Sequence, residues 1–138
     1  FSWIRSVEID RCRWKDCAVK FNNNDRVKLY LGSTESRLWD MIEDIKVPCT
    51  FWLDAHWSGN NEPMSENKCP LEIELSIIAQ HPIKTHTILI DDMRCCGTDY
   101  FDFKSRKFIE EKVLLVNPKY KIFYEDSWEP QDILVARI

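Results

Sequence analysis

The sequence predicts an α/β fold in which a largely parallel sheet carries helices on both faces. Short apolar runs alternate with segments of helical periodicity, and this alternation indicates repeated strand–helix–strand units. The chain has only three glycines, and each follows the end of an apolar run, where the backbone must turn sharply. The last two apolar runs, 120–124 and 133–138, flank a short polar segment and predict an antiparallel hairpin.

The spacing of apolar residues predicts each element in turn. Strands are expected at 4–10, 27–31, 49–54 and 86–91, ahead of the final hairpin. Helices are expected after Asp10, after Gly32-Ser33, at about 70–80 and at 108–117. The second of these helices places four apolar residues on one stripe: Leu38, Met41, Ile42 and Ile45. Trp52, inside the strand 49–54, is expected in the core.

Length and composition indicate a single globular domain spanning residues 1–138. The formal charge is −4 and Lys and Arg form no cluster, so no nucleic-acid partner is indicated. No apolar run approaches the roughly 20 residues that span a bilayer, so no membrane partner is expected. Six cysteines in a chain with a sizeable core favour reduced thiols and a cytoplasmic location over a disulfide scaffold.

Acidic residues follow the predicted strands at the ends where parallel sheets bind ligands. Glu8 and Asp10 end the first strand, Asp54 ends the third, and Asp91-Asp92 end the fourth. Asp10 is expected to cap the following helix, whereas Glu8 can accept hydrogen bonds from a ribose diol. Clustered carboxylates repel one another unless a cation or a proton intervenes, which favours Mg²⁺ or Ca²⁺ at Asp54, Asp91 and Asp92. The alternative is that Asp92 caps a turn and Asp91 binds backbone amides.

His56 and Trp57 lie just beyond Asp54. His56 is a candidate general base, a cofactor contact or an orienting group. Trp57 can stack on a flat ligand or cover the sheet edge. A zinc site is disfavoured because the cysteines lack paired ligand spacing. The aromatic residues after Gly97 wall a substrate pocket or pack under their own loop: Tyr100, Phe101 and Phe103.

These segments together resemble a known enzyme family. The series SVEID, VKLYLGS, FWLDAHWSG, ILIDDMRCCG and a final hairpin is similar to class I S-adenosylmethionine-dependent methyltransferases, and closest to O-methyltransferases of the macrocin and catechol type. The resemblance runs from the family's second strand to its last. It implies a sheet of order 3-2-1-4-5-7-6 with an antiparallel last strand.

The resemblance also implies roles for particular residues. Glu8 corresponds to the acid that holds the cofactor ribose, and Ser33 lies where the family places an acid near the adenine. Asp54 corresponds to the first metal ligand of cation-dependent members and Asp91-Asp92 to their acidic pair. His56 and Trp57 match a His-Trp in catechol-type enzymes. The resemblance thus implies that five residues bind the cofactor: Glu8, Ser33, Asp54, His56 and Trp57. It also implies that His56 and Asp54 are catalytic.

Three departures from the family pattern accompany the resemblance. The lysine base that follows the His-Trp in catechol-type enzymes is replaced by Ser58, and no acid ends the second strand. No Gly-x-Gly occurs, so the family's first strand, the cofactor-cradling turn and the first helix are not represented. Because that strand is central to the family's sheet, its loss should leave a hole in both the core and the pocket.

The expected function is therefore methyl transfer from S-adenosylmethionine to a small hydroxylated molecule or a sugar, assisted by Mg²⁺. The chain is expected to be a fragment that by itself is inactive and binds cofactor weakly or not at all. Two alternatives remain open. One is a metal-dependent transferase of a sugar-nucleotide or phosphoryl group, and the other is a non-catalytic Rossmann-like module.

Overall fold

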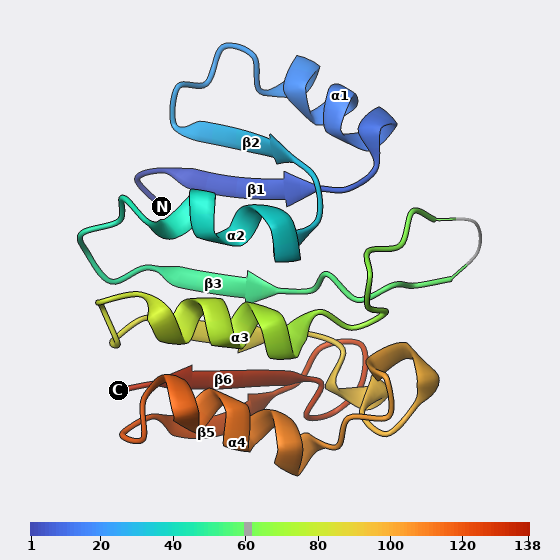
Figure 1. Ribbon diagram of the computed structural model, residues 1–138, viewed down its shortest axis with the longest axis vertical. Coiled ribbons are helices and arrows are strands. Elements are labelled where there is room, and N and C mark those ends of the chain that lie inside the picture. Colours follow the sequence, from blue (N-terminus) through green and yellow to red (C-terminus); the bar gives the residue numbers. More distant parts are fainter. Residues whose placement is uncertain (60–61) are drawn as a thin grey trace.

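Strands and helices alternate along the chain in the computed structural model, which describes residues 1–59 and 62–138 (Figure 1). The order of the elements is β1 (Ile4–Glu8), α1 (Arg11–Lys20), β2 (Val27–Leu31), α2 (Thr34–Ile42), β3 (Thr50–Leu53), α3 (Leu71–Gln80), β4 (Thr87–Ile90), η1 (Met93–Cys95), η2 (Asp99–Phe101), α4 (Arg106–Val116), β5 (Lys121–Glu125) and β6 (Ile133–Arg137). The predicted α/β class is confirmed, and each predicted strand and helix is present.

The strands form two separate sheets. β1 and β2 pair in parallel as a two-stranded sheet, and the other strands form a four-stranded sheet of order β3-β4-β6-β5. β3 and β4 are parallel, whereas β6 runs antiparallel to both β4 and β5. The predicted parallel pairs and the predicted C-terminal hairpin are therefore both observed.

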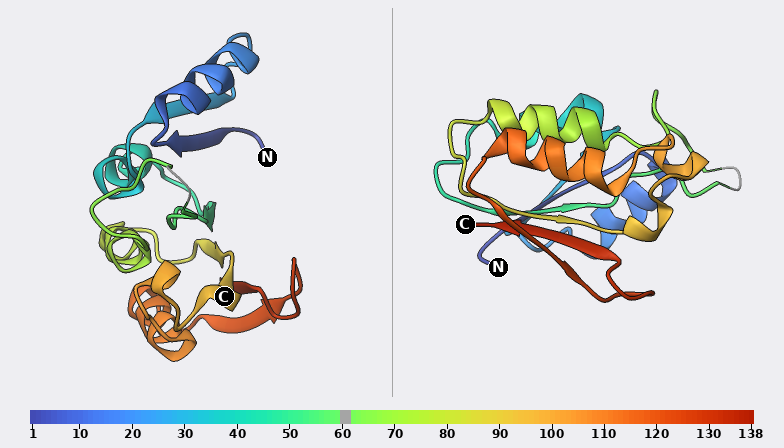
Figure 2. Two further views of the ribbon diagram at one scale, coloured as in Figure 1. Left: turned by 90° about the vertical axis from the view of Figure 1, so that its right-hand side faces the viewer. Right: turned by 90° about the horizontal axis from the view of Figure 1, so that it is seen from below.

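Helices lie on both sides of the strands, as predicted, with α1 packed on β1 and β2 of the smaller sheet. Figure 2 shows α2, α3 and α4 on one side and α1 on the other. The core lies under the three grouped helices, where Ile78 of α3 and Val113 of α4 meet Ile88 and Ile90 of β4, all with no solvent exposure. Strand β4 is central to the larger sheet and therefore anchors the loop that follows it. Within the described residues, no helix is both long and apolar enough to cross a bilayer.

The two sheets are separated by a gap between β1 and β3. Within residues 1–59 and 62–138, no backbone pairing joins these two strands. A cavity of about 1180 Å³ lies between them, lined by residues of β1, α2 and β3. The resemblance places the family's first strand at this position, and the hole predicted from its absence is present. The cavity extends to the rim formed by the carboxyl ends of both strands.

Trp52 is not in the core, contrary to the prediction. Its side chain is 54% exposed, whereas its neighbours Phe51 and Leu53 are buried. Alternate residues of a strand point to opposite faces of the sheet. Phe51 and Leu53 join the core cluster that α2 and α3 help to form, whereas Trp52 points to the other face. The apolar run at 49–54 indicated a strand but not that one of its faces is open.

Candidate functional site

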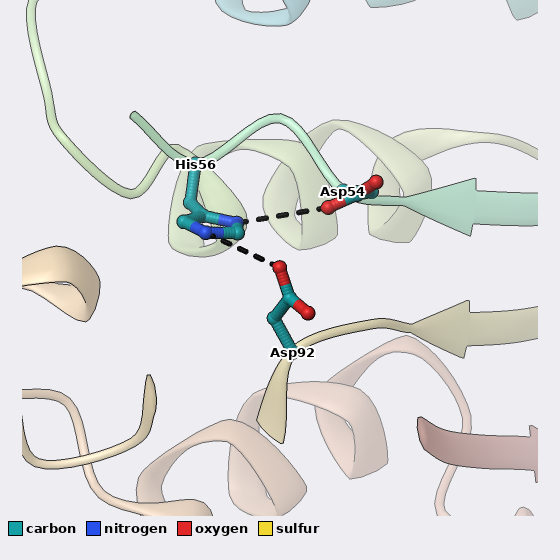
Figure 3. A group of neighbouring side chains, drawn as sticks. All are labelled: Asp54, His56 and Asp92. Carbon is teal, nitrogen blue, oxygen red and sulfur yellow. Dashed lines mark ion pairs between the residues drawn. The ribbon is translucent and has the colours of Figure 1, made fainter. Parts of the chain in front are cut away.

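Three of the predicted residues meet at the rim of the sheet, beyond the ends of β3 and β4 (Figure 3). His56 lies between two carboxylates, with Nδ1 3.7 Å from Oδ1 of Asp54 and Nε2 3.3 Å from Oδ2 of Asp92. One ligand atom from each of the three residues lies within 4.8 Å of the others. The imidazole is thus positioned to bridge the two acids, and the same atoms are close enough to share one ion.

The local electrostatics favour a cation at this rim. The pKa of Asp54 is raised above its ordinary value, first by partial burial and then by the nearby carboxylates of Asp92 and Asp91. His56 and Arg94 oppose that rise. A carboxyl group whose ionisation is opposed by like charges gains most from a bound cation or a proton. His56 and Arg94 therefore offset the effects of burial and of the neighbouring acids only in part.

Asp91 is held differently from the other two acids. Its Oδ1 accepts a hydrogen bond from the backbone N–H of Asp92 at 2.8 Å, which agrees with the structural alternative for this residue. Asp91 and Asp92 form a second group with Asp132, and Asp54 is not part of it. The predicted trio of Asp54, Asp91 and Asp92 is therefore divided into two neighbouring groups that share Asp92.

Glu8 and Ser33 take part in local backbone contacts at the ends of their strands. Oε1 of Glu8 accepts a hydrogen bond from the N–H of Asp10 at 2.7 Å. Asp10 caps α1 as predicted, and its side chain accepts from the N–H groups of Cys12 and Arg13. Ser33 caps α2, where its hydroxyl accepts from the N–H of Ser36 at 3.3 Å. Both strand ends are fixed by these contacts.

Trp57 is folded against the loop that follows it. Its indole N–H donates to the carbonyl of Glu62 at 3.2 Å, and its backbone N–H donates to the carbonyl of Lys68 at 2.7 Å. The ammonium of Lys68 lies 5.6 Å from the ring centre. The indole therefore ties residues 62–68 to the rim, and residues 60–61 lie outside the described part of this loop.

The aromatic residues after Gly97 have different environments. Phe101 is 1% exposed and lies under His56, with ring centroids 5.2 Å apart. Tyr100 and Phe103 are largely exposed. Phe101 thus follows the expectation of packing under its own loop, and it supports the imidazole of His56 from below.

The predicted cofactor residues all border a single cavity. The wall of the 1180 Å³ cavity includes Asp92 and every residue predicted to bind the cofactor: Glu8, Ser33, Asp54, His56 and Trp57. These residues come from the ends of β1, β2 and β3 and from the loop after β4. The cavity therefore joins the expected ribose site to the acidic rim, although its residues are far apart in the sequence.

Three functional candidates were not predicted from the sequence. Arg94 and the fully buried Asp132 form an ion pair beside Asp92. Glu74 of α3 is also fully buried and borders the cavity. Arg94 is separated from Asp92 only by Met93 in the sequence, so its position near Asp92 could have been predicted. Asp132 lies 38 residues further along the chain than Arg94, and no local pattern relates the two.

The donor atoms at the rim fit a hard divalent cation. Asp54 and Asp92 supply carboxylate oxygens, which Mg²⁺ and Ca²⁺ prefer, and His56 supplies a nitrogen. Burial, and after it the nearby carboxylates of Asp92 and Asp91, raise the pKa of Asp54, so a cation here would favour its ionised form. The same arrangement also fits a His56 ring that lies between the two acids without a metal ion. The chemistry of the site is therefore that of an acidic rim with room for one added positive charge.

Comparison with known proteins identifies the fold. No protein-family model and no curated protein matches the sequence. Among solved structures, a candidate rRNA-methylase from Clostridium thermocellum matches with a TM-score of 0.56 and 19% identity, covering 99% of this chain and 75% of the other. A candidate caffeoyl-CoA O-methyltransferase from Staphylococcus aureus also matches with a TM-score of 0.56, at 11% identity.

The chain therefore has the Rossmann-like fold of these two structures. The match to the staphylococcal protein covers 98% of this chain but only 64% of that one, so the chain spans less than two thirds of its length. At identities this low, the likeness establishes the arrangement of strands and helices alone. It agrees with the fold that the strand and loop motifs imply.

Proposed function

We propose that this chain forms the greater part of an S-adenosylmethionine-dependent O-methyltransferase of the macrocin or catechol type. The observation that carries the proposal is the single cavity bordered by all five predicted cofactor residues, which continues to the acidic rim. The two solved structures that share the fold both have methyltransferase names, and this supports the same assignment.

The residues around the cavity have distinct proposed tasks. Glu8 binds the ribose diol, because its carboxylate lies at the end of β1 and is oriented by the N–H of Asp10. Ser33, His56 and Trp57 border the cofactor cavity, and the indole of Trp57 closes the site by anchoring residues 62–68. When bound, the sulfonium cofactor supplies the methyl group. The protein's own contribution is to align that group with an acceptor oxygen at the rim.

Asp54 and Asp92 are the proposed ligands of a divalent cation, with Asp91 adjacent. A bound Mg²⁺ would lower the pKa of a substrate hydroxyl and orient it. His56 then has a positioning and proton-accepting role, because it contacts both carboxylates and rests on Phe101. Ser58 occupies the position of the family's lysine base, so His56 is the proposed base in this chain.

We further propose that one parallel strand, from polypeptide outside these 138 residues, completes the sheet between β1 and β3. The gap, the cavity and the limited coverage of the related structures support this. The completed sheet would also close the floor of the cofactor site. The 138-residue chain alone is accordingly proposed to be inactive.

The proposed acceptor is a small hydroxylated molecule or a sugar. The formal charge of −4 and the acidic rim disfavour a polyanionic partner such as nucleic acid. All six cysteines are unpaired in the structure, which agrees with a reducing, cytoplasmic location.

The test is calorimetric titration with S-adenosylhomocysteine. The 138-residue chain should show no micromolar affinity, whereas a longer polypeptide that includes the completing strand should bind. In that longer protein, Glu8→Gln should weaken binding at least about tenfold, because a ribose–carboxylate bond is charge-assisted. Asp54→Asn should remove any Mg²⁺-dependent methyl transfer from radiolabelled cofactor.

Asp40→Asn serves as a matched control, because Asp40 is an exposed acid on α2 that pairs only with Arg37 among the described residues. It should change neither affinity nor Mg²⁺ dependence. The absence of cofactor binding in the longer, folded protein would reject methyl transfer. It would leave a nucleotide-dependent transferase or a non-catalytic module.

A further inference from the structure

Beside the rim there is a second group of acids that already contains a cation. One carboxylate oxygen from each of Asp91, Asp92 and Asp132 lies within 4.8 Å of the others. The guanidinium of Arg94 lies among them, with its terminal nitrogen 2.5 Å from Oδ1 of Asp92 and in direct contact with Oδ2 of Asp132. One positive group therefore bridges two of the three acids.

Arg94 divides the two oxygens of Asp92 between the two groups. Oδ1 faces Arg94, whereas Oδ2 lies 3.3 Å from Nε2 of His56. Only Oδ2 is directed toward the rim site formed with Asp54. The guanidinium thereby fixes the direction in which Asp92 presents its free oxygen.

Asp132, the residue before β6, holds this arrangement in place. Its side chain is fully buried, and its Oδ1 accepts from the backbone N–H of Arg94 at 3.0 Å. Its carbonyl accepts from the N–H of Met93 at 2.8 Å. These bonds fix the turn after Asp92, whose backbone is left-handed at φ 59, a conformation that is unfavourable for residues other than glycine. A buried carboxylate without these partners would be strongly destabilising.

We propose that Arg94 is the resident cation of the Asp91–Asp92–Asp132 group and, with Asp132, a positioning residue for Asp92. The rim then offers one position for an exchangeable divalent ion, between Asp54, His56 and Asp92, and not two. Only the statement about the exchangeable ion rests on the proposed function. The role of Arg94 follows from its own contacts.

The charge and shape of the guanidinium explain why it excludes a second ion. Three carboxylates this close repel one another and require compensation. A planar guanidinium supplies several donors in a fixed plane and can serve two carboxylates at once, which a compact ammonium group does less well. A divalent ion at the same place would have to displace a guanidinium that both Asp92 and Asp132 hold.

The test is the number of Mn²⁺ ions bound per folded chain, measured by paramagnetic resonance of free Mn²⁺ and by calorimetry, in the wild-type chain and in Arg94→Gln. The vacated position should accept an ion, so the variant should bind one more Mn²⁺ than the wild type. This increment is expected whether the wild type binds one ion or none. If the proposed rim site binds no metal, the wild-type chain will bind no Mn²⁺ but the increment in Arg94→Gln will remain. The failure of the proposed metal site can therefore be distinguished from the failure of the role proposed for Arg94.

Three further variants define the outcome. Arg94→Gln combined with Asp132→Asn should lose the additional ion, and Arg94→Lys should not gain it. Arg13→Gln, which removes an exposed arginine paired with Glu62, should leave the count unchanged. A folded Arg94→Gln chain with the wild-type count would overturn the proposal.

The variant remains informative if it does not fold in the absence of metal. In that case millimolar Mn²⁺ should restore the native circular dichroism and a cooperative thermal transition, because the ion replaces the lost charge. Failure of Mn²⁺ to restore folding would show that the guanidinium contributes only packing and hydrogen bonds, and it would overturn the proposal.

Discussion

Nε2 of His86 lies 3.0 Å from Nδ1 of His81 in the core, and neither side chain is exposed to solvent. On its other edge, Nδ1 of His86 lies 3.1 Å from the backbone nitrogen of Cys49, the residue before β3. The backbone N–H can only donate, so Nδ1 of His86 accepts and its proton is on Nε2. This ring is therefore neutral, and it links the segment before β4 to the segment before β3.

The first prediction concerns acid stability. Burial, together with the neighbouring His81 and Lys84, lowers the pKa of His86 from 6.5 to about 4. Because the unfolded chain binds this proton more readily, the stabilising term is complete above pH 6.5 and is lost as the pH falls toward 4. The loss at pH 5 should be about 2 kcal/mol. Urea unfolding of the wild type and of His86→Gln at pH 7.5 and pH 5 measures it, because the difference in stability between the two proteins should change by this amount between the two pH values.

The second prediction concerns Glu74, whose contribution to stability depends on pH in the opposite direction to that of His86. Its carboxylate is fully buried, and neither oxygen has a hydrogen-bond partner within residues 1–59 and 62–138. Burial raises its pKa to about 7. The nearby side chain of Thr34 lowers this pKa in part, although its position does not meet the geometric criteria of a hydrogen bond. The folded state therefore binds the extra proton, and stability falls as the pH rises from 4.5 to 7.

Replacing this carboxyl should stabilise the chain at neutral and alkaline pH. Glu74→Met keeps a similar shape without the charge, so the free energy of unfolding at pH 8 should rise by about 2–3 kcal/mol. Glu72→Met, at an exposed position of the same helix, should change it by less than about 0.5 kcal/mol. Equal effects of the two substitutions would contradict the assignment.

The Glu74 and His86 terms largely cancel in the wild-type chain, because they act over overlapping pH ranges with opposite signs. The His86 dependence is therefore best measured in the Glu74→Met background. There the stability should decrease steadily from pH 7 to pH 5, whereas the wild type should change little.

The periodicity of the sequence was sufficient to predict the strands and helices, and the family resemblance implied the order of the strands. Neither predicted the residues that support the site from behind. Strand and helix positions follow from local spacing, and Asp54, His56 and Asp92 were placed at one rim because parallel strands end together. The pairing of Arg94 with Asp132 depends on β6 lying beside β4, a contact between segments that no local pattern relates. The burial of Glu74 likewise depends on how α3 packs. Trp52 was assigned to the core because periodicity cannot show that one face of a strand lacks a helix.

The third prediction concerns the balance of charge at the rim. Asp54→Asn removes a carboxylate whose pKa is raised by burial and by Asp92 and Asp91. The variant should be at least as stable as the wild type to heat in the absence of metal, because repulsion is relieved. Any increase in melting temperature that Mg²⁺ gives to the wild type should disappear in it. A clear loss of stability without metal would instead show that Asp54 has a structural role through His56.

The fourth prediction concerns the gap in the sheet. β4 is paired on both sides, whereas β1 and β3 are each paired on one side and face the cavity on the other. In hydrogen exchange, amides of β1 and β3 should open with a lower free energy than those of β4, giving rates at least about tenfold faster. In a longer polypeptide that includes the completing strand, both segments should become protected. β5 is the matched control, because within the described residues it too is paired on one side only, and it lies away from the gap, so its exchange should not change. If β1 and β3 are already as protected as β4 in the 138-residue chain, the gap does not accept a strand.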